Sequence, residues 1–285
     1  MLELYINVLK MSEVKALSNN LFSKRNKSLL RELVKTEFKL RYQNSFLGYA
    51  WSLLKPLGLF TVLYVVFTKI FSFGAGIPHY PVYLLLGIVL WTFFIESTGG
   101  ALSSIVGRGD LIRKISFPKY IIVISGTVSS LINLFLSLVI VLIFALFNGV
   151  SFGSQALFAP LLIGEVYALV LGIGLILSTL YVNFRDLSHI WEVLMQAAFY
   201  AIPIIYDIHL VFTEFNATAA KIIMLNPVSQ IIQDLRYSLV TKSTARTTDI
   251  VQMPFALIPY LLVPLILLVG SVYFRKRSKF FAEQI

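Results

Sequence analysis

Few side chains in this sequence have the types and spacing that catalysis or metal binding requires. His189 and Glu192 stand three residues apart, which suits two metal ligands on one helix face, but no second histidine–carboxylate set accompanies them. The chain has no cysteine, which excludes disulfides and thiolate metal sites. We find no set of nucleophile, base and acid in the apolar runs. The sequence therefore predicts a protein that is not an enzyme and has no metal or cofactor of its own.

Ionisable side chains inside apolar segments are the remaining candidates, because a charge in hydrocarbon is retained mainly where it has a function. Glu96 and Glu165 lie within apolar runs, although a hydrogen bond across a helix interface would be a purely structural role for either. Lys55 and Pro56 lie near the start of another run. Since proline bends a helix, we predict that this pair forms a hinge at the inner end of a span. A snorkelling lysine beside a passively bent helix is the alternative.

Aromatic residues recur at helical spacing in the first long apolar run. At 100° per residue, four of them fall on one narrow arc: Tyr49, Phe60, Tyr64 and Phe67. Such a stripe is typical of helix packing or of lipid contact. Flat rings also offer a surface along which the C–H faces of sugars can slide without being held firmly. Both interpretations are open from the residues alone.

The composition is that of an integral membrane protein. Hydrophobic residues make up 58% and charged residues 13%, whereas about a quarter of a soluble domain is charged. Crossing a bilayer takes about 20 mostly apolar residues. We predict an all-α fold with six spans, at roughly 46–71, 82–107, 120–147, 156–184, 187–206 and 254–274. The predicted domains are an N-terminal segment 1–45, a six-span domain 46–274 with a long outer loop 207–253, and a tail 275–285.

Basic residues cluster beside particular apolar runs and so predict the topology. They stand before the first run, between the second and third, and after the last, whereas the loops "SFGAGIPHYP" and "NGVSFGSQ" contain no Lys, Arg, Asp or Glu. By the positive-inside rule, both termini lie in the cytoplasm. This topology accounts for the net charge of +10, so we do not expect a nucleic-acid partner.

Two cytoplasmic segments are predicted to form amphipathic helices. Residues 27–42 separate apolar and charged faces at helical spacing, except that Glu37 and Arg41 interrupt the apolar face and indicate a protein contact or an internal salt bridge. Residues 107–120 have the same mixed character. A membrane-surface anchor is one interpretation of such helices, and a docking surface for a cytoplasmic motor is the other. The predicted docking residues are Arg31, Glu32, Lys35, Glu37, Arg41, Ile112, Arg113 and Lys114.

The outer loop contains a third helical signal, "NPVSQIIQDLRYSLV". Asn226 can cap a helix, and Pro227 suits its first turn. Ile231 and other apolar residues then share one face. We predict a re-entrant or interfacial helix at the outer side, with a plain surface helix as the alternative.

Four of these stretches together are similar to one transporter family. "LVKTEFKLRYQNSFLGYAWSLLKPL", "LIRKISFPKY", "YVNFRDLSHIWEVLMQAAFYAIPIIY" and "LNPVSQIIQDLR" resemble, in this order, segments of ABC-2-type permeases that export bacterial polysaccharides such as O-antigen, capsule and teichoic acid. The resemblance runs from about residue 30 to the end of the sequence.

The resemblance implies a homodimer in the bacterial cytoplasmic membrane, served by two separate ATPase subunits, that exports a lipid-linked glycan. It also implies that spans one and five line the conduit, adding Phe199 and Tyr200 to the aromatic stripe, and that Asn226, Pro227 and Ile231 belong to an outer gate. The sequence itself lacks the G-x-x-x-x-G-K-[ST] loop that cradles nucleotide phosphates. ATP and Mg²⁺ are therefore expected on the partner ATPase.

Other transport classes fit the sequence less well. An ABC-2 permease for a drug or a lipid would share the fold, and the aromatic stripe argues mildly against it. A secondary transporter would need an ion-coupling carboxylate site and paired broken helices. An intramembrane glycosyltransferase or acyltransferase would need clustered acid and base residues, which are missing from the sequence.

Overall fold

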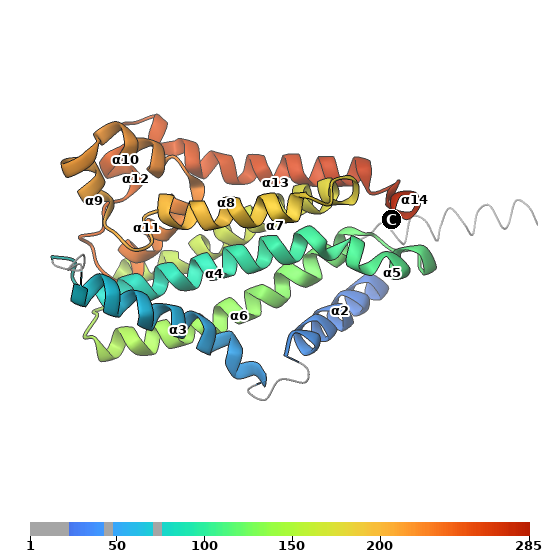
Figure 1. The fold of residues 1–285 in the computed structure, drawn as a ribbon, viewed down its shortest axis with the longest axis horizontal. Helices are drawn as coiled ribbons and strands as arrows, with labels where there is room; N and C mark the ends of the chain where they lie inside the picture. The colour runs from blue at the N-terminus through green and yellow to red at the C-terminus, as the bar shows by residue number, and fades with distance from the viewer. Residues whose placement is uncertain (1–22, 43–47, 71–75) are drawn as a thin grey trace, which may run out of the picture.

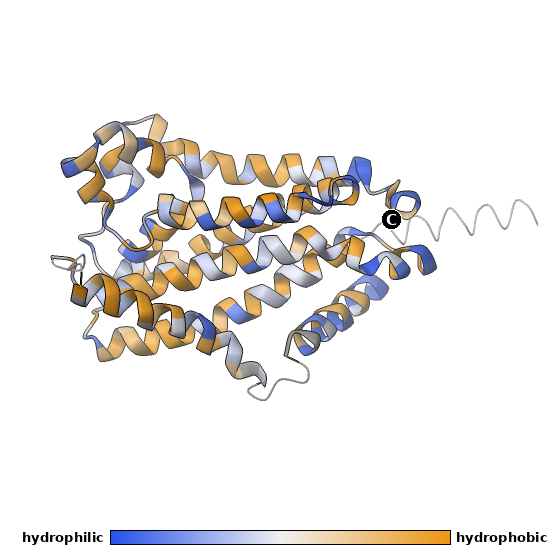
Figure 2. Ribbon diagram, viewed as in Figure 1, coloured by the Kyte–Doolittle hydropathy of each residue, from blue (hydrophilic) through white to orange (hydrophobic). Residues whose placement is uncertain are grey.

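The computed structural model describes residues 23–42, 48–70 and 76–285, apart from the side chains of residues 40–42, 49 and 69. Every regular element within this described part is helical, and the long helices run side by side as a bundle (Figure 1). Figure 2 shows hydrophobic residues along the length of the bundle, and hydrophilic residues gathered at the end that carries the C-terminus. The all-α prediction is confirmed for the described residues.

Five helical segments of the described chain are long and apolar enough to cross a membrane. They are α3 (Trp51–Tyr64) with the π-helix Val65–Ile70 that follows it, α4 (Tyr80–Ser104), α6 (Tyr120–Phe147), α7 (Ala159–Asn183) and α13 (Ile258–Arg277). Their bounds lie within a few residues of five of the predicted spans. The protein is therefore a multi-pass membrane protein.

The segment predicted as the fifth span, 187–206, has a different structure. Helix α8 (Leu187–Ala201) has 15 residues and is about 22 Å long, short of the roughly 30 Å of a hydrocarbon core. Residues 202–206 continue as irregular backbone, and four of these five residues are buried. Irregular backbone at membrane depth is tolerated where protein surrounds it. The prediction of six helical spans is thus supported for five, and the remaining segment is a short helix with a non-helical extension.

Helix α4 is the central element of the core. It contacts α3, α6, α7, α8 and α11 (Pro227–Leu239), and its residues 82–91 are all buried. Helices α7 and α13 pack against each other at Gly172 and Gly270, where a Cβ atom on Gly172 would lie 2.8 Å from the backbone of Leu267. The many contacts of α4 make it the scaffold on which the other helices are arranged.

Short helices cover the two ends of the bundle. At the end away from the C-terminus lie α9 (Ile208–Leu210), the π-helix Val211–Phe215, α10 (Ala217–Met224), α11 and α12 (Thr247–Ile250) (Figure 1). At the other end, α2 (Lys24–Tyr42), α5 (Gly109–Lys114) and α14 (Phe281–Gln284) share one hydrophobic cluster. The N-terminal helix and the C-terminal helix therefore lie at the same end of the bundle.

The last residues of the chain pack back onto this end. Phe281 is buried in the cluster that also contains Ile112 of α5, and Phe274 of α13 meets its ring edge-on. Lys119 donates a hydrogen bond of 2.5 Å to the carbonyl oxygen of Ser278. Burial lowers the pKa of Lys119, while the charge of Glu283 opposes that shift. The C-terminal segment thus holds α5 in place.

Candidate functional site

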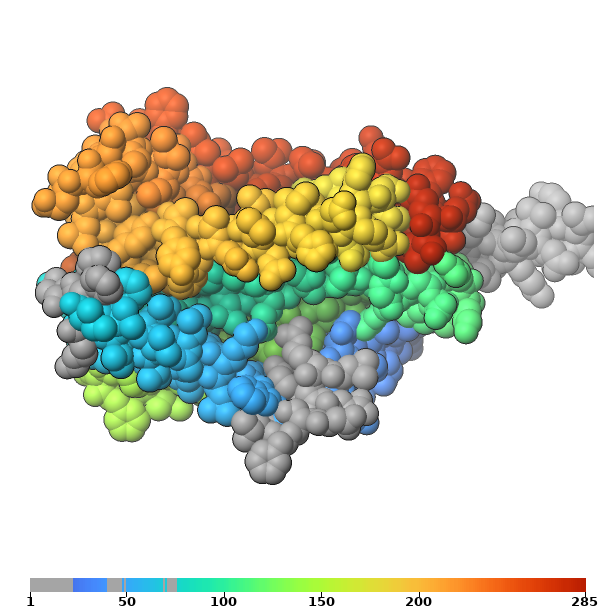
Figure 3. All heavy atoms as spheres, in the orientation of Figure 1, coloured from blue at the N-terminus to red at the C-terminus, as the bar shows by residue number. Residues whose placement is uncertain are grey.

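A cavity of about 710 Å³ lies between α3, α4 and α8. This size is typical of ligand sites in proteins, roughly 300–1,000 Å³. In Figure 3, α8 (yellow) and α3 (blue) border a strip of α4 on the face shown. We call this cavity the α3–α8 groove; among the residues that line it are Lys55, Trp91, Glu96, Trp191, Glu192 and Tyr200.

An ion pair joins two of the helices around the α3–α8 groove. Lys55 Nζ on α3 lies 3.1 Å from Glu96 Oε1 on α4, and Glu192 on α8 lines the same space. Lys55 therefore has a carboxylate partner within the protein. Glu96 makes a contact between two helices, which is the structural role that the sequence analysis considered for it. The groove combines a charged pair with apolar walls.

Aromatic rings from α8 and α4 form much of the groove lining. Trp191 Nε1 donates a hydrogen bond of 3.1 Å to Thr98 Oγ1, which fixes the indole against α4. The rings of Phe199 and Tyr200 meet edge-to-face at 5.2 Å, and the ring of Phe199 lies 6.3 Å from that of Trp91. Because Trp191 and Phe199 are eight residues apart on one helix, they fall on the same face of α8.

The predicted conduit residues divide between the groove and the core. Phe199 and Tyr200 line the α3–α8 groove. Phe60 is buried, with its ring 5.6 Å from that of Tyr64 and 5.7 Å from that of Phe144 on α6. Phe67, like Tyr64, packs against the same core cluster while partly exposed. The side chain of Tyr49 lies outside the described residues. For Phe60 this placement favours the packing interpretation.

The predicted hinge residues point to different surroundings. Lys55 is exposed to the groove, whereas the next residue, Pro56, is buried inside α3. Pro56 lies beside Val89 of α4 and Ser137 of α6. The hinge role of this pair remains a prediction.

A charged surface covers the end of the bundle that carries the C-terminus. On α2, Arg31, Glu32 and Lys35 are exposed, with a 3.0 Å ion pair between Lys35 and Glu32. On α5, Arg113 and Lys114 are exposed. We call these five residues the basal surface; the side chain of Arg41 lies outside the described residues. Ile112, also predicted to dock a partner, is buried in the cluster with Phe281 and so anchors α5 instead of presenting a contact.

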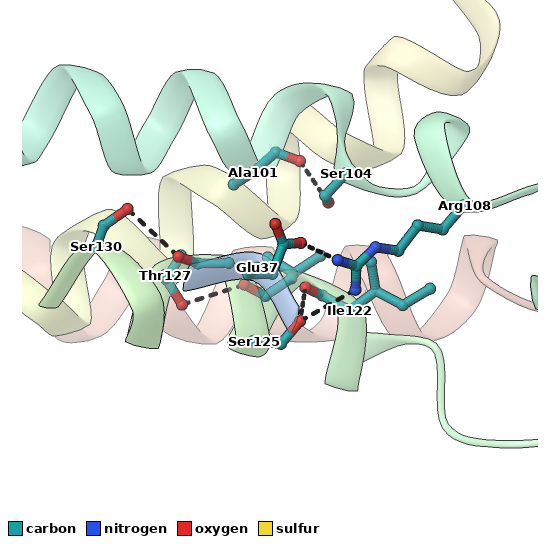
Figure 4. A network of polar contacts seen from close by, with 10 residues as sticks. Glu37, Ala101, Ser104, Arg108, Ile122, Ser125, Thr127 and Ser130 are labelled. Carbon is teal, nitrogen blue, oxygen red and sulfur yellow. Dashed lines mark hydrogen bonds and ion pairs between the residues drawn. The ribbon is translucent and has the colours of Figure 1, made fainter. Parts of the chain in front are cut away.

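Glu37 has an ion-pair partner far along the sequence. Arg108, in the 3₁₀ turn Val106–Arg108 between α4 and α5, donates from Nη2 to Glu37 Oε1, and Nη1 lies 3.5 Å from Ser125 Oγ on α6 (Figure 4). The Glu37 and Arg108 side chains are 28% and 17% exposed, so both charges are largely removed from water. Glu37 thus has an internal ion-pair partner in Arg108, whereas the sequence prediction considered the neighbouring Arg41, and the Glu37–Arg108 pair ties α2 to the turn after α4 and to α6.

Replacing Glu37 with glutamine tests this connection. The change leaves the Arg108 guanidinium with a weaker partner in a partly buried site, so we expect the free energy of unfolding in detergent to fall by about 1–3 kcal/mol. Glu32→Gln is the matched control, because the Glu32–Lys35 pair has side chains that are 67% and 57% exposed. Exposed pairs contribute about 0–1 kcal/mol. Equal losses for the two variants would contradict the role of Glu37 as a tie.

A buried arginine at the opposite end is a feature that sequence reasoning missed. Arg236 of α11 is fully buried, and its guanidinium donates to the carbonyl oxygens of Tyr83 (3.0 Å), Pro203 (2.6 Å) and Ile204 (2.6 Å). It also lies 3.5 Å from the centroid of the Tyr83 ring and 3.1 Å from Gln233 Oε1. Two carbonyl groups of the irregular backbone after α8 thus obtain their hydrogen bonds from α11, and the next carbonyl, of Ile205, accepts one of 2.8 Å from the Tyr80 hydroxyl on α4.

Two features of the sequence relate to this arrangement. Pro203 interrupts the run predicted as a helix, and Gly87 faces Arg236 from α4, where an added Cβ atom would overlap the guanidinium.

Asn226 accepts a hydrogen bond of 2.9 Å from the N–H of Val228, and Pro227 is in the first turn of α11. The predicted helix start is confirmed, but α11 is buried on its polar face as well as at Ile231. It is therefore not a plain surface helix.

Comparison with known families supplies the context for this architecture. A family model described as "ABC-2 type transporter" matches residues 28–240. The chain belongs to the ABC-2 transporter family. The matched region begins in α2 and ends just after α11, so it contains the basal surface, the α3–α8 groove and the Arg236 site.

Several curated relatives of this ABC-2 permease bear the same name, "O-antigen export system permease protein RfbA". One from Myxococcus xanthus is 32% identical over 202 residues, 71% of this chain and 76% of its own. One from Klebsiella pneumoniae is 29% identical over 210 residues, 73% of this chain and 78% of its own. Another from Klebsiella pneumoniae is 26% identical over 257 residues, 90% of this chain and 94% of its own. The likeness to the third relative extends over most of both chains.

Proposed function

We propose that this ABC-2 permease is the membrane subunit of an ATP-driven exporter, and that it moves a lipid-linked polysaccharide of O-antigen type across the bacterial cytoplasmic membrane. The observation that carries the proposal is the α3–α8 groove, which combines aromatic rings with the Lys55–Glu96 pair along a membrane-spanning helix bundle. Aromatic faces suit the C–H surfaces of sugars, and the few polar groups suit hydroxyls. The names of the relatives agree with a glycan substrate.

The conduit is completed by a second copy of the chain. The groove is open on one side in the single protomer, and α3 and α8 expose large apolar side chains beside it. These include Trp51, Leu54 and Leu59 on α3 and Val193, Leu194 and Tyr200 on α8. A patch of this kind is typical of a protein interface, and most homo-oligomers are two-fold symmetric. In a homodimer the two grooves face each other and enclose the glycan.

The energy source is a pair of cytoplasmic ATPase subunits that bind ATP and Mg²⁺ and dock on the basal surface. This surface lies at the same end as both described chain ends, which the positive-inside rule places in the cytoplasm. Movement of α2 reaches α6 and the turn after α4 through the Glu37–Arg108 pair. At the opposite, outer end, α11 and the backbone that Arg236 holds form the gate through which the glycan leaves.

An ABC-2 permease for a drug or a lipid is the second candidate. It would share the fold and the ATPase contact, so only the groove distinguishes the two. Charged and indole groups along the groove favour a long, hydroxyl-rich substrate over an apolar one.

Charge reversal on the basal surface tests the docking part of the proposal. Arg31→Glu with Lys35→Glu alters exposed side chains, so membrane insertion and folding should be unchanged. We expect the affinity for the ATPase to fall about tenfold, equivalent to about 1.4 kcal/mol, with a parallel loss of transport-coupled ATP hydrolysis. The control is Lys242→Glu, an exposed reversal in the segment between α11 and α12 at the other end of the bundle. Wild-type affinity and coupling in the double variant would rule out docking at α2.

A further inference from the structure

A second cavity, of about 420 Å³, lies outside the α3–α8 groove, between the start of α7, α11 and the start of α13. Both polar and apolar side chains line it. The polar ones used below are Asp234, Arg246 and Tyr260, and the apolar ones are Phe158, Leu161 and Leu162. We call this cavity the α7–α13 pocket.

Asp234, a residue that lines the α7–α13 pocket, has one carboxylate oxygen without a hydrogen-bond donor. Asp234 is 8% exposed, and its Oδ2 atom accepts hydrogen bonds from Gln230 Nε2 (2.8 Å) and from the Tyr260 hydroxyl (2.6 Å). Its Oδ1 atom is buried and has no partner. Burial raises the pKa of Asp234, while the hydrogen bonds from Tyr260 and Gln230 and the charge of Arg246 oppose that shift. A cationic donor at Oδ1 would stabilise the ionised carboxylate and offset the effect of its burial.

A cation lines the same cavity. Arg246 lies with its guanidinium 4.4 Å from the centroid of the Tyr237 ring, and its Nε atom is 3.7 Å from Asp249 Oδ2. That separation is too long for a hydrogen bond. The α7–α13 pocket thus offers an unsatisfied anion and a positive group to one ligand.

The mouth of the pocket lies beside surface that faces lipid. Phe158 and Leu161 are 61% and 71% exposed, and Leu257, in the turn before α13, and Leu261, in the first turns of α13, are also exposed. All four stand at the ends of membrane-spanning helices, the ends away from the C-terminal helix. This is the level at which phospholipid headgroups meet acyl chains.

We propose that the α7–α13 pocket binds a phospholipid whose headgroup carries both a phosphate and a primary ammonium group, as in phosphatidylethanolamine. The ammonium donates to Asp234 Oδ1, the phosphate lies at Arg246, and the acyl chains lie along Phe158 and Leu161. A choline headgroup has no N–H to donate, and a glycerol headgroup has no cation. The pocket therefore discriminates between lipids by their hydrogen-bond donors.

The test is lipid retention by the full-length permease, measured by native mass spectrometry after exchange into mixed micelles of defined phospholipids. We expect the ethanolamine lipid to be retained at least fivefold better than its choline counterpart, with intermediate retention as the nitrogen is methylated stepwise. This series needs no variant. Equal retention of ethanolamine, choline and glycerol lipids would overturn the proposal.

Two variants assign the selectivity to named groups. Asp234→Asn keeps an oxygen for Gln230 and Tyr260 but places an amide donor at Oδ1, so the preference for ethanolamine over choline should disappear. Arg246→Gln should lower retention of all the phospholipids. Glu214→Gln, an exposed acidic position at the same end, is the control and should leave the preference intact. Unchanged preference in Asp234→Asn, or displacement of lipid by a soluble oligosaccharide, would show that the pocket serves another ligand.

Discussion

Replacing Arg236 with methionine is expected to lower the free energy of unfolding by about 2–6 kcal/mol. The arginine supplies the hydrogen bonds of the Pro203 and Ile204 carbonyl groups, which lie in buried, non-helical backbone. Without it, each of these two carbonyls is left unsatisfied, at about 1–3 kcal/mol apiece. The measurement is thermal or denaturant unfolding of the purified protein in detergent, together with its folded yield. Arg275→Met is the control, because Arg275 is exposed in the last turn of α13.

Glycine 87 offers an independent check on the same site. In a helix interior, Gly→Ala favours stability by roughly 1 kcal/mol on helix propensity alone. At Gly87 the new Cβ atom would overlap the guanidinium of Arg236, so we expect Gly87→Ala to destabilise the protein. Gly100→Ala, in the same helix, meets no atom within 4 Å and should be neutral or stabilising. If the two alanine variants have the same stability, or if Arg236→Met unfolds like wild type, then the hydrogen bonds of Arg236 do not stabilise the outer end of the bundle.

Loss of aromatic rings from the α3–α8 groove is expected to impair export. Tyr200 has a largely exposed ring in the groove, and Trp191 lies further along the same helix. If sugars pass over these rings, the double variant Trp191→Ala with Tyr200→Ala should lower the rate of glycan export about tenfold or more. Each lost ring removes roughly 1 kcal/mol of contact, and 1.4 kcal/mol is a factor of ten. ATPase binding should change little, because the basal surface is intact.

The control for this variant is Phe135→Ala with Phe147→Ala. Both of these rings are exposed on α6, and neither is among the residues that line the groove. Removal of them should leave export within about twofold of wild type. Export is measured as surface glycan per molecule of permease, so that a change in expression is not counted as a change in rate. Equal defects in the two double variants would mean that the rings act through lipid contact or general stability.

Local signals predicted the parts of this fold that depend on neighbours in sequence. The start of α11 followed from Asn226 and Pro227, and the bounds of α6 followed from the ends of its apolar run. Hydropathy could not show that α8 stops at Ala201, because residues 202–206 are as apolar as a membrane helix. The non-helical backbone of these residues depends on hydrogen bonds from Arg236, more than 30 residues away, and from Tyr80, 125 residues away.

Long-range pairs explain why the candidate site was only partly predicted. Glu37 was expected to have a charged or protein partner, but Arg108 is 71 residues away. Lys55 and Glu96 were both singled out, yet their pairing across 41 residues requires α3 to lie along α4. For Phe60, the helical arc was counted correctly, but that arc faces α6 as well as the interior. Periodicity defines a face of a helix, and only the packing decides what that face meets.

Photo-crosslinking from inside the α3–α8 groove tests the central claim most directly. A photoreactive amino acid placed at Phe199 faces the groove, whereas one at Leu268 lies on the exposed surface of α13. In cells that synthesise the glycan, we predict that illumination attaches glycan to the permease from position 199 and not from position 268. Attachment from position 268 alone, or from neither position while export continues, would show that the glycan takes a path other than the groove.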